Sequence, residues 1–157
     1  TLRLQPVDLI SFIKYHVTLN QELASPKEIK IVAEFDSDLP ELNLDMAKME
    51  QVLNNLLSNA VKYSHQGTTI YLRVYREEDA VVIAVQDHGV GIPTESLDKL
   101  FKPFSTANVQ ATGGEKSIGL GLAIVERIVK GHNGRIHVES TVNQGSTFYV
   151  SLPIDQS

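Results

Sequence analysis

The sequence contains no cysteine, which excludes disulfide bonds and metal sites built from thiolates. It has no run of basic residues and a net charge of −5, which argues against a surface that follows nucleic-acid phosphates. Its five histidines show no close metal-ligand spacing. No apolar run approaches the roughly 20 residues that span a membrane, and no signal peptide opens the chain. We expect a cytoplasmic domain without direct contact to nucleic acid or membrane; any membrane segment of a longer parent would lie outside these residues.

What the sequence does contain is an ordinary globular balance, with 42% hydrophobic and 21% charged residues. A length of 157 residues suits one domain, residues 1–157, with a sizeable core. Periodicity predicts helices at 7–24, 45–63 and 119–130, with a short one near 94–100. It predicts strands at 28–35, 68–76, 80–86, 135–139 and 146–152. The strand 80–86 is apolar on both faces, so we expect it to lie centrally in the sheet. Helices with mostly antiparallel strands indicate an α+β layer sandwich.

The long helix 45–63, which Asp45 can cap, has two distinct faces. We expect its core face to be formed by Met46, Met49, Leu53, Leu56, Leu57 and Ala60. Asn55, Asn59 and Lys62 recur at i, i+4 and i+7, so they share another stripe. Periodicity alone also fits a solvated polar face, but asparagine is a poor helix former and a solvated face would use better ones. Carboxamide oxygens suit Mg²⁺, and a lysine can neutralise a phosphate.

Two glycine turns flank other elements. Asp87, Gly89 and Gly91 follow the apolar strand 80–86, and Gly119 and Gly121 open the last helix. A buried carboxylate at the first turn can accept a hydrogen bond from an exocyclic amine such as that of adenine. At the second turn, the free amides at the start of the helix can face a phosphate. The alternatives are a plain strand-to-helix turn and a flexible helix cap. Neither turn has the third glycine of a dinucleotide-binding fingerprint.

In this order and spacing the motifs resemble the ATP-binding catalytic domain of sensor histidine kinases. That group is part of the superfamily of gyrase, the ninety-kilodalton heat-shock chaperone and the mismatch-repair ATPases. The resemblance covers residues 7–153 and rests on an asparagine box, a first glycine box, a phenylalanine box, a second glycine box and a closing motif. These lie at residues 51–64, 87–91, 101–104, 119–122 and 145–148. It implies a two-layer α/β sandwich with about three helices on a mixed, mostly antiparallel sheet.

The resemblance also implies ATP and Mg²⁺ as ligands. Asn59, with Asn55, would bind the metal, and these two with Lys62 would be the catalytic residues. Asp87 would accept from the adenine amino group, with Thr147 nearby through water, and a lid would span about 101–118. The implied nucleotide contacts are Asn59, Lys62, Tyr63, Asp87, Gly89, Gly91, Ile92, Lys102, Phe104, Gly119, Leu120, Gly121, Leu122 and Thr147. Tyr63 would pack on adenine or belong partly to the core.

One position distinguishes the subclasses of this superfamily. Its ATP hydrolases place a glutamate one turn before the metal asparagine, whereas here Asn55 stands there and cannot accept a proton. None of the five histidines is followed by an acid, as family acceptor histidines are. We therefore expect transfer of the γ-phosphoryl group to a histidine on a separate dimerisation domain of the same parent. A response regulator would be a further partner, and a homodimer would form only in the full-length parent. A related serine protein kinase, and less so an ATP-driven conformational clamp, remain alternatives.

Overall fold

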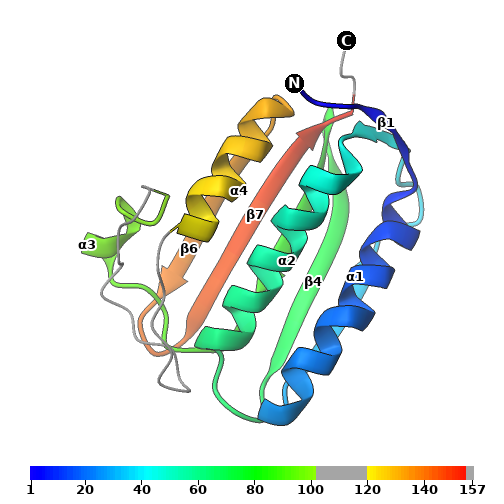
Figure 1. The fold of residues 1–157 in the computed structure, drawn as a ribbon. Helices are drawn as coiled ribbons and strands as arrows, with labels where there is room; N and C mark the ends of the chain where they lie inside the picture. The colour runs from blue at the N-terminus through cyan, green and yellow to red at the C-terminus, as the bar shows by residue number, and fades with distance from the viewer. Residues whose placement is uncertain (102–119, 155–157) are drawn as a thin grey trace.

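Three long helices cover one face of a five-stranded sheet (Figure 1). The computed structural model describes residues 1–101 and 120–154. The helices are α1 (Leu9–Ala24), α2 (Met46–Tyr63) and α4 (Leu120–Gly131). Helix α2 lies between the other two in the helical layer (Figure 1). The predicted two-layer α+β sandwich is confirmed.

The sheet has the strand order β2-β4-β5-β7-β6. Its strands are β2 (Lys30–Phe35), β4 (Thr69–Glu77), β5 (Ala80–Gln86), β6 (Arg135–Thr141) and β7 (Gly145–Pro153). Only β2 and β4 pair in parallel; the other neighbours pair antiparallel. The expected central place of β5 is confirmed, since all five residues from 81 to 85 are buried.

Several short elements were not predicted. Strands β1 (Gln5–Val7) and β3 (Leu42–Leu44) form a separate antiparallel pair. Three residues are too few to show a period, so local sequence gave no signal for them. A 3-10 turn, η1 (Ser25–Lys27), follows α1. The short helix predicted near 94–100 is present as α3 (Thr94–Leu97), after the first glycine turn.

The core lies between the sheet and the helices. Helix α2 contributes a continuous buried stripe, consisting of Met49, Val52, Leu53, Leu56, Leu57 and Ala60. The expectation that Met46 belongs to this face is wrong, because its side chain is 40% exposed. Met46 is the first helical residue, and the buried stripe begins only one turn later at Met49. In the described part of the chain, no helix combines the length and apolarity needed to cross a bilayer.

Candidate functional site

Helix α2 is fixed at its start by Asp45, the cap that the sequence predicted. One carboxylate oxygen accepts from the backbone N–H of Lys48 at 3.2 Å, and the other accepts from the N–H of Arg3 at 3.0 Å. The N–H of Asp45 itself donates to Nε2 of the buried His132 at 3.0 Å. This cluster ties α2 to the end of α4 and to the N-terminal segment, so the polar stripe of α2 has a fixed orientation.

The other end of α2 is fixed by Lys27, which the sequence analysis missed. Its Nζ donates to the carbonyls of Val61 at 2.9 Å, Lys62 at 3.0 Å and Ser64 at 3.4 Å. An ammonium at the end of a helix satisfies the last carbonyls and complements the helix dipole. The contact spans more than thirty residues, so no local pattern pointed to it.

The polar stripe of α2 meets the glycine turn that opens α4. Nδ2 of Asn55 donates to the carbonyl oxygen of Gly121 at 3.3 Å. Asn59 and Lys62 are half-buried, like Asn55. The neighbouring Asn54 has a structural role instead, because its Oδ1 accepts a hydrogen bond from Nδ2 of Asn20 on α1 at 3.0 Å. The two motifs thus come together in space, and the stripe is more than a solvated face.

Asp87 directly follows the central strand β5 and is only 5% exposed. Its Oδ1 accepts from the N–H of Ser146 at 3.1 Å, and its own N–H donates to the carbonyl of Ser146 at 2.8 Å. Burial raises the pKa of the Asp87 carboxyl to about 6, although the N–H groups of Ser146 and Gly89 act in the opposite direction. A buried carboxylate held by backbone amides is a suitable acceptor for a donor on a ligand.

The residue bonded to Asp87 is Ser146, and the expected Thr147 follows it in β7 and lines the same hollow as Asp87. Successive residues of a strand point to opposite faces, and Ser146 is buried with Phe148 on the helix side. Thr147 shares the other face with Tyr149. The buried Phe148, two positions away, is the signal in the sequence that could have pointed to Ser146 as the inward-facing residue.

The glycines of the first turn are required by the chain's own backbone. A Cβ on Gly89 would overlap the carbonyl oxygen of Tyr63, and a Cβ on Gly91 would overlap that of Thr141. Gly91 also has a φ of +72°, which favours glycine. Gly121 differs, because its Cβ would meet Asn55 at an ordinary 3.5 Å. The fold therefore leaves room for a Cβ at 121, where close approach to a ligand can account for the glycine, whereas at 89 and 91 the fold alone requires glycine.

The remaining predicted site residues divide into two groups. Ile92 and Leu122 are 8% and 7% exposed and belong to the edge of the core. Lys102, Phe104, Gly119, the side chain of Leu120 and nearly all of the predicted lid lie outside the described residues. Within residues 1–101 and 120–154, no group of three or more histidine, aspartate or glutamate side chains gathers as a metal site. The hard oxygen donors on the α2 stripe are the carboxamides of Asn55 and Asn59.

Residues 44–156 match the family described as histidine kinase-, DNA gyrase B-, and HSP90-like ATPase. The chain belongs to this family. Family membership makes it an ATP-binding domain, as the resemblance implied, and the matched region contains α2, both glycine turns and the closing strand β7.

Relatives of this ATPase-family chain are sensor kinases. It is 37% identical to the alginate biosynthesis sensor protein KinB of Pseudomonas aeruginosa over 94% of the chain, which spans 27% of the length of KinB. The catalytic domain of histidine kinase ThkA superposes with a TM-score of 0.84 at 25% identity, covering 99% of this chain and 100% of that one. ThkA is also known in complex with the response regulator protein TrrA. Full-length ShkA in complex with AMPPNP superposes with a TM-score of 0.87 at 27% identity, covering 100% of this chain and 32% of that one.

Proposed function

We propose that this chain is the catalytic domain of a two-component sensor histidine kinase. It binds Mg-ATP and donates the γ-phosphoryl group to a histidine on a dimerisation domain of the same parent protein. The observation that carries this proposal is the hydrogen bond from Asn55 to Gly121. It places a carboxamide, not a water-activating glutamate, where α2 meets the start of α4.

The proposed metal contacts follow from the orientation of the carboxamides. Since the NH₂ group of Asn55 is engaged by Gly121, its carbonyl oxygen is the group left to face a cation. Asn59, one turn further along α2, supplies a second such oxygen, and Lys62 supplies a positive charge for the phosphates. Neutral oxygen donors suit Mg²⁺ that shares its coordination with nucleotide phosphates.

Asp87 is proposed as the residue that recognises the base. Neutral pH lies above the pKa of Asp87, which is about 6, so the carboxylate is ionised. It then accepts a hydrogen bond from the adenine amino group. The N–H of Ser146 keeps one carboxylate oxygen in place. Tyr63, at the end of α2, is proposed to cover the ring.

Phosphoryl transfer needs positioning and charge neutralisation more than covalent help from the protein. A domain that holds Mg-ATP without a base of its own suits transfer to an outside histidine. The AMPPNP complex of ShkA and the complex of ThkA with TrrA support ATP and a response regulator as partners. The parent would work in the cytoplasm, because ATP and response regulators are found there. It would form a homodimer through its dimerisation domain.

The metal role is tested by isothermal titration of ATP with Mg²⁺ and with a chelator. Asn59→Ala should remove the gain in affinity that Mg²⁺ gives and leave the apo fold intact. Asn54→Ala is the matched control, since Asn54 binds Asn20 and should affect stability but not the metal dependence. Equal affinity with and without Mg²⁺ in the unaltered chain would contradict the proposal.

The transfer reaction is tested with radiolabelled ATP, with and without a dimerising hairpin from the parent that carries its acceptor histidine. We expect acid-labile label on the hairpin and none on this chain alone. Acid-stable label would favour the serine-kinase alternative. Acid-labile label on this chain alone would mean that one of its own five histidines is the acceptor.

A further inference from the structure

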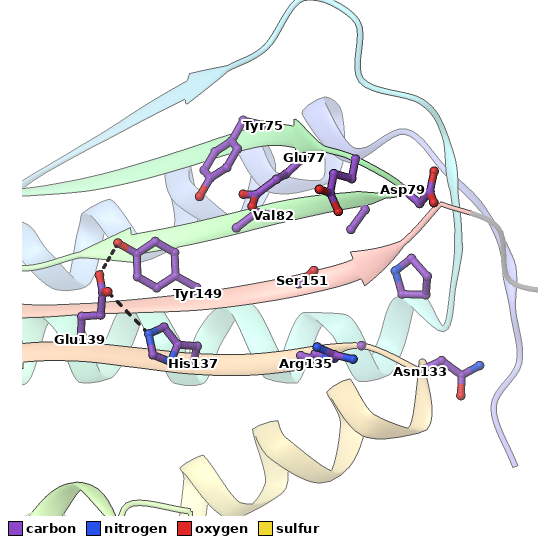
Figure 2. A pocket seen from close by; sticks show the side chains of 14 residues that line it. Tyr75, Glu77, Asp79, Val82, Asn133, Arg135, His137, Glu139, Tyr149 and Ser151 are labelled. Carbon is purple, nitrogen blue, oxygen red and sulfur yellow. Dashed lines mark hydrogen bonds and ion pairs between the residues drawn. The ribbon is translucent and has the colours of Figure 1, made fainter.

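The face of the sheet opposite the helices is open. No helix or strand in the described part of the chain lies over it, and Figure 2 shows its side chains in front of the sheet with the helices behind. A hollow of about 660 Å³ lies on this face. The nucleotide site proposed above is on the helix side, so this hollow needs an explanation of its own.

The register of the strands shapes the hollow into a groove along β5. Val82 pairs with Tyr75 of β4 on one side and with Ser151 of β7 on the other. Ala80 continues the floor, while Tyr75 and Tyr149 stand as walls (Figure 2). Strands β4 and β7 lie two strand spacings apart, about 10 Å, which is wide enough for one extended chain.

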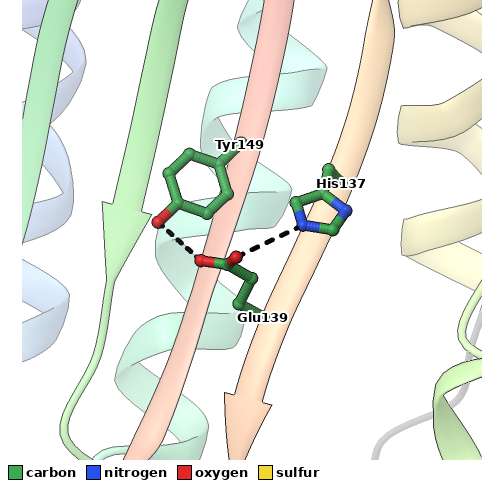
Figure 3. Close-up of polar contacts among 3 residues, drawn as sticks. All are labelled: His137, Glu139 and Tyr149. Atoms are coloured by element: carbon green, nitrogen blue, oxygen red, sulfur yellow. Dashed lines mark hydrogen bonds and ion pairs between the residues drawn. The ribbon is translucent and has the colours of Figure 1, made fainter.

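One wall of the groove is held in place by polar contacts (Figure 3). The hydroxyl of Tyr149 donates to Oε1 of Glu139 at 3.0 Å, and Nε2 of His137 lies 3.6 Å from Oε2. The rings of His137 and Tyr149 also stack, with centroids 5.8 Å apart. A carboxylate and an aromatic ring are thus pre-oriented side by side, which lowers the entropy cost of binding a cation there.

The groove carries excess negative charge. Four carboxylates and one arginine line it, namely Glu77, Glu78, Asp79, Glu139 and Arg135. Burial raises the pKa of the Tyr75 hydroxyl, and Glu77 raises it further. Burial likewise raises the pKa of the Tyr149 hydroxyl, and its hydrogen bond to Glu139 raises that pKa further. Arg73 acts in the opposite direction on both phenols, so the attraction for cations comes from the excess of carboxylates along the groove.

We propose that this groove docks an extended, basic segment of a partner protein that carries lysine or arginine together with apolar side chains. Cationic side chains would lie near Glu77 and Glu139, beside the rings of Tyr75 and Tyr149. Arg73 lies 5.8 Å from the centroid of the Tyr75 ring and His137 stacks on Tyr149, so a cation of the partner would approach the other side of each ring.

Apolar side chains of the segment would contact the floor at Val82. The groove is wide enough for an extended chain, and a free polyamine has nothing to place on that floor.

The test is fluorescence anisotropy with a short labelled peptide of alternating arginine and valine, added to the 157-residue chain without nucleotide. The double variant Glu77→Gln/Glu139→Gln should weaken binding about tenfold, since two exposed charge contacts are lost. Tyr75→Ala should weaken it about threefold through the lost cation–π contact. The matched control, Glu22→Gln/Glu50→Gln, removes two exposed acids from α1 and α2 and should leave affinity unchanged.

Each other outcome overturns the proposal. Equal binding of a peptide with glutamine in place of arginine would show that charge does not select the occupant. Equal weakening by the control pair would show non-specific attraction to an acidic chain. Self-association of the chain in sedimentation, abolished by Val82→Arg, would assign the groove to a second copy. Amide resonances of β5 and β7 that do not shift on peptide addition would place the peptide elsewhere.

Discussion

The two faces of the sheet carry two polar sites of opposite character. On the helix side, Asp87 is 5% exposed, and burial, opposed by backbone hydrogen bonds, raises its pKa to about 6. On the open side, Glu139 is a well-exposed acid, with 65% of its side chain accessible, and is oriented by Tyr149. Burial disfavours the ionised form of a carboxylate, so a hydrogen-bond donor on a ligand stabilises that form strongly. An exposed carboxylate stays hydrated, so it contributes mainly by attracting and orienting a charged partner.

The largest expected effect tests the difference between the faces within one strand. Leu72 and Tyr71 are neighbours on β4, with 0% and 36% exposure. Leu72→Ala should lower the free energy of unfolding by about 2–5 kcal/mol, because it opens a cavity in the core. Tyr71→Ala should lower it by about 1 kcal/mol or less. Urea unfolding measures both. Similar losses for the two variants would mean that the open face is covered in solution.

The next effect separates glycines needed by the fold from glycines free to serve a ligand. Gly89→Ala should cost about 3 kcal/mol, since its Cβ would overlap the carbonyl of Tyr63. Gly121→Ala should fold normally, because its Cβ would meet Asn55 only at contact distance. Thermal unfolding and ATP titration should be measured on both. A folded Gly121→Ala variant with unchanged ATP affinity would contradict a role of that turn at the phosphates.

Asp87→Asn should raise apo stability and lower ATP affinity. The carboxylate of Asp87 has a folded pKa of about 6, above its ordinary 3.8, so its ionisation destabilises the fold as pH rises between those values. The variant should therefore be more stable than the original by about 1–3 kcal/mol at pH 8 and by little near pH 4. ATP should bind about tenfold more weakly, because an NH₂ group would oppose the adenine amine. A stability difference that does not change with pH would rule out this account.

The smallest effect concerns the hairpin at the end of the groove. Glu77 pairs with Ala80, so Glu78 and Asp79 form a two-residue loop in which Glu78 has a φ of +56°. Asparagine tolerates that conformation better than glutamate. Glu78→Asn should therefore stabilise the chain by about 0.5 kcal/mol, measured by urea unfolding. Glu22→Gln, on exposed α1, should change nothing.

The sequence by itself determined the long helices, the five strands of the main sheet and most of the core face of α2. Periodicity located α1, α2, α4 and the five strands of the sheet, because burial on one face imposes a period of 3.6 or 2 wherever an element is long enough. The apolar run of β5 was enough to predict its central place. Asp45 was identified as a cap because capping depends on residues next to each other in the chain. The asparagine stripe and the glycine turns were likewise visible as local patterns.

Only the tertiary structure decided which distant groups meet. The pairing of β5 with β7 brought the N–H of Ser146 to the carboxylate of Asp87. The packing of η1 against α2 brought Lys27 to the last carbonyls of that helix. The groove over Val82 exists because side chains from four strands project to one face, and pairing partners cannot be deduced from the period of any one strand. Local patterns specify which face of an element is apolar, whereas register and packing specify what that face touches.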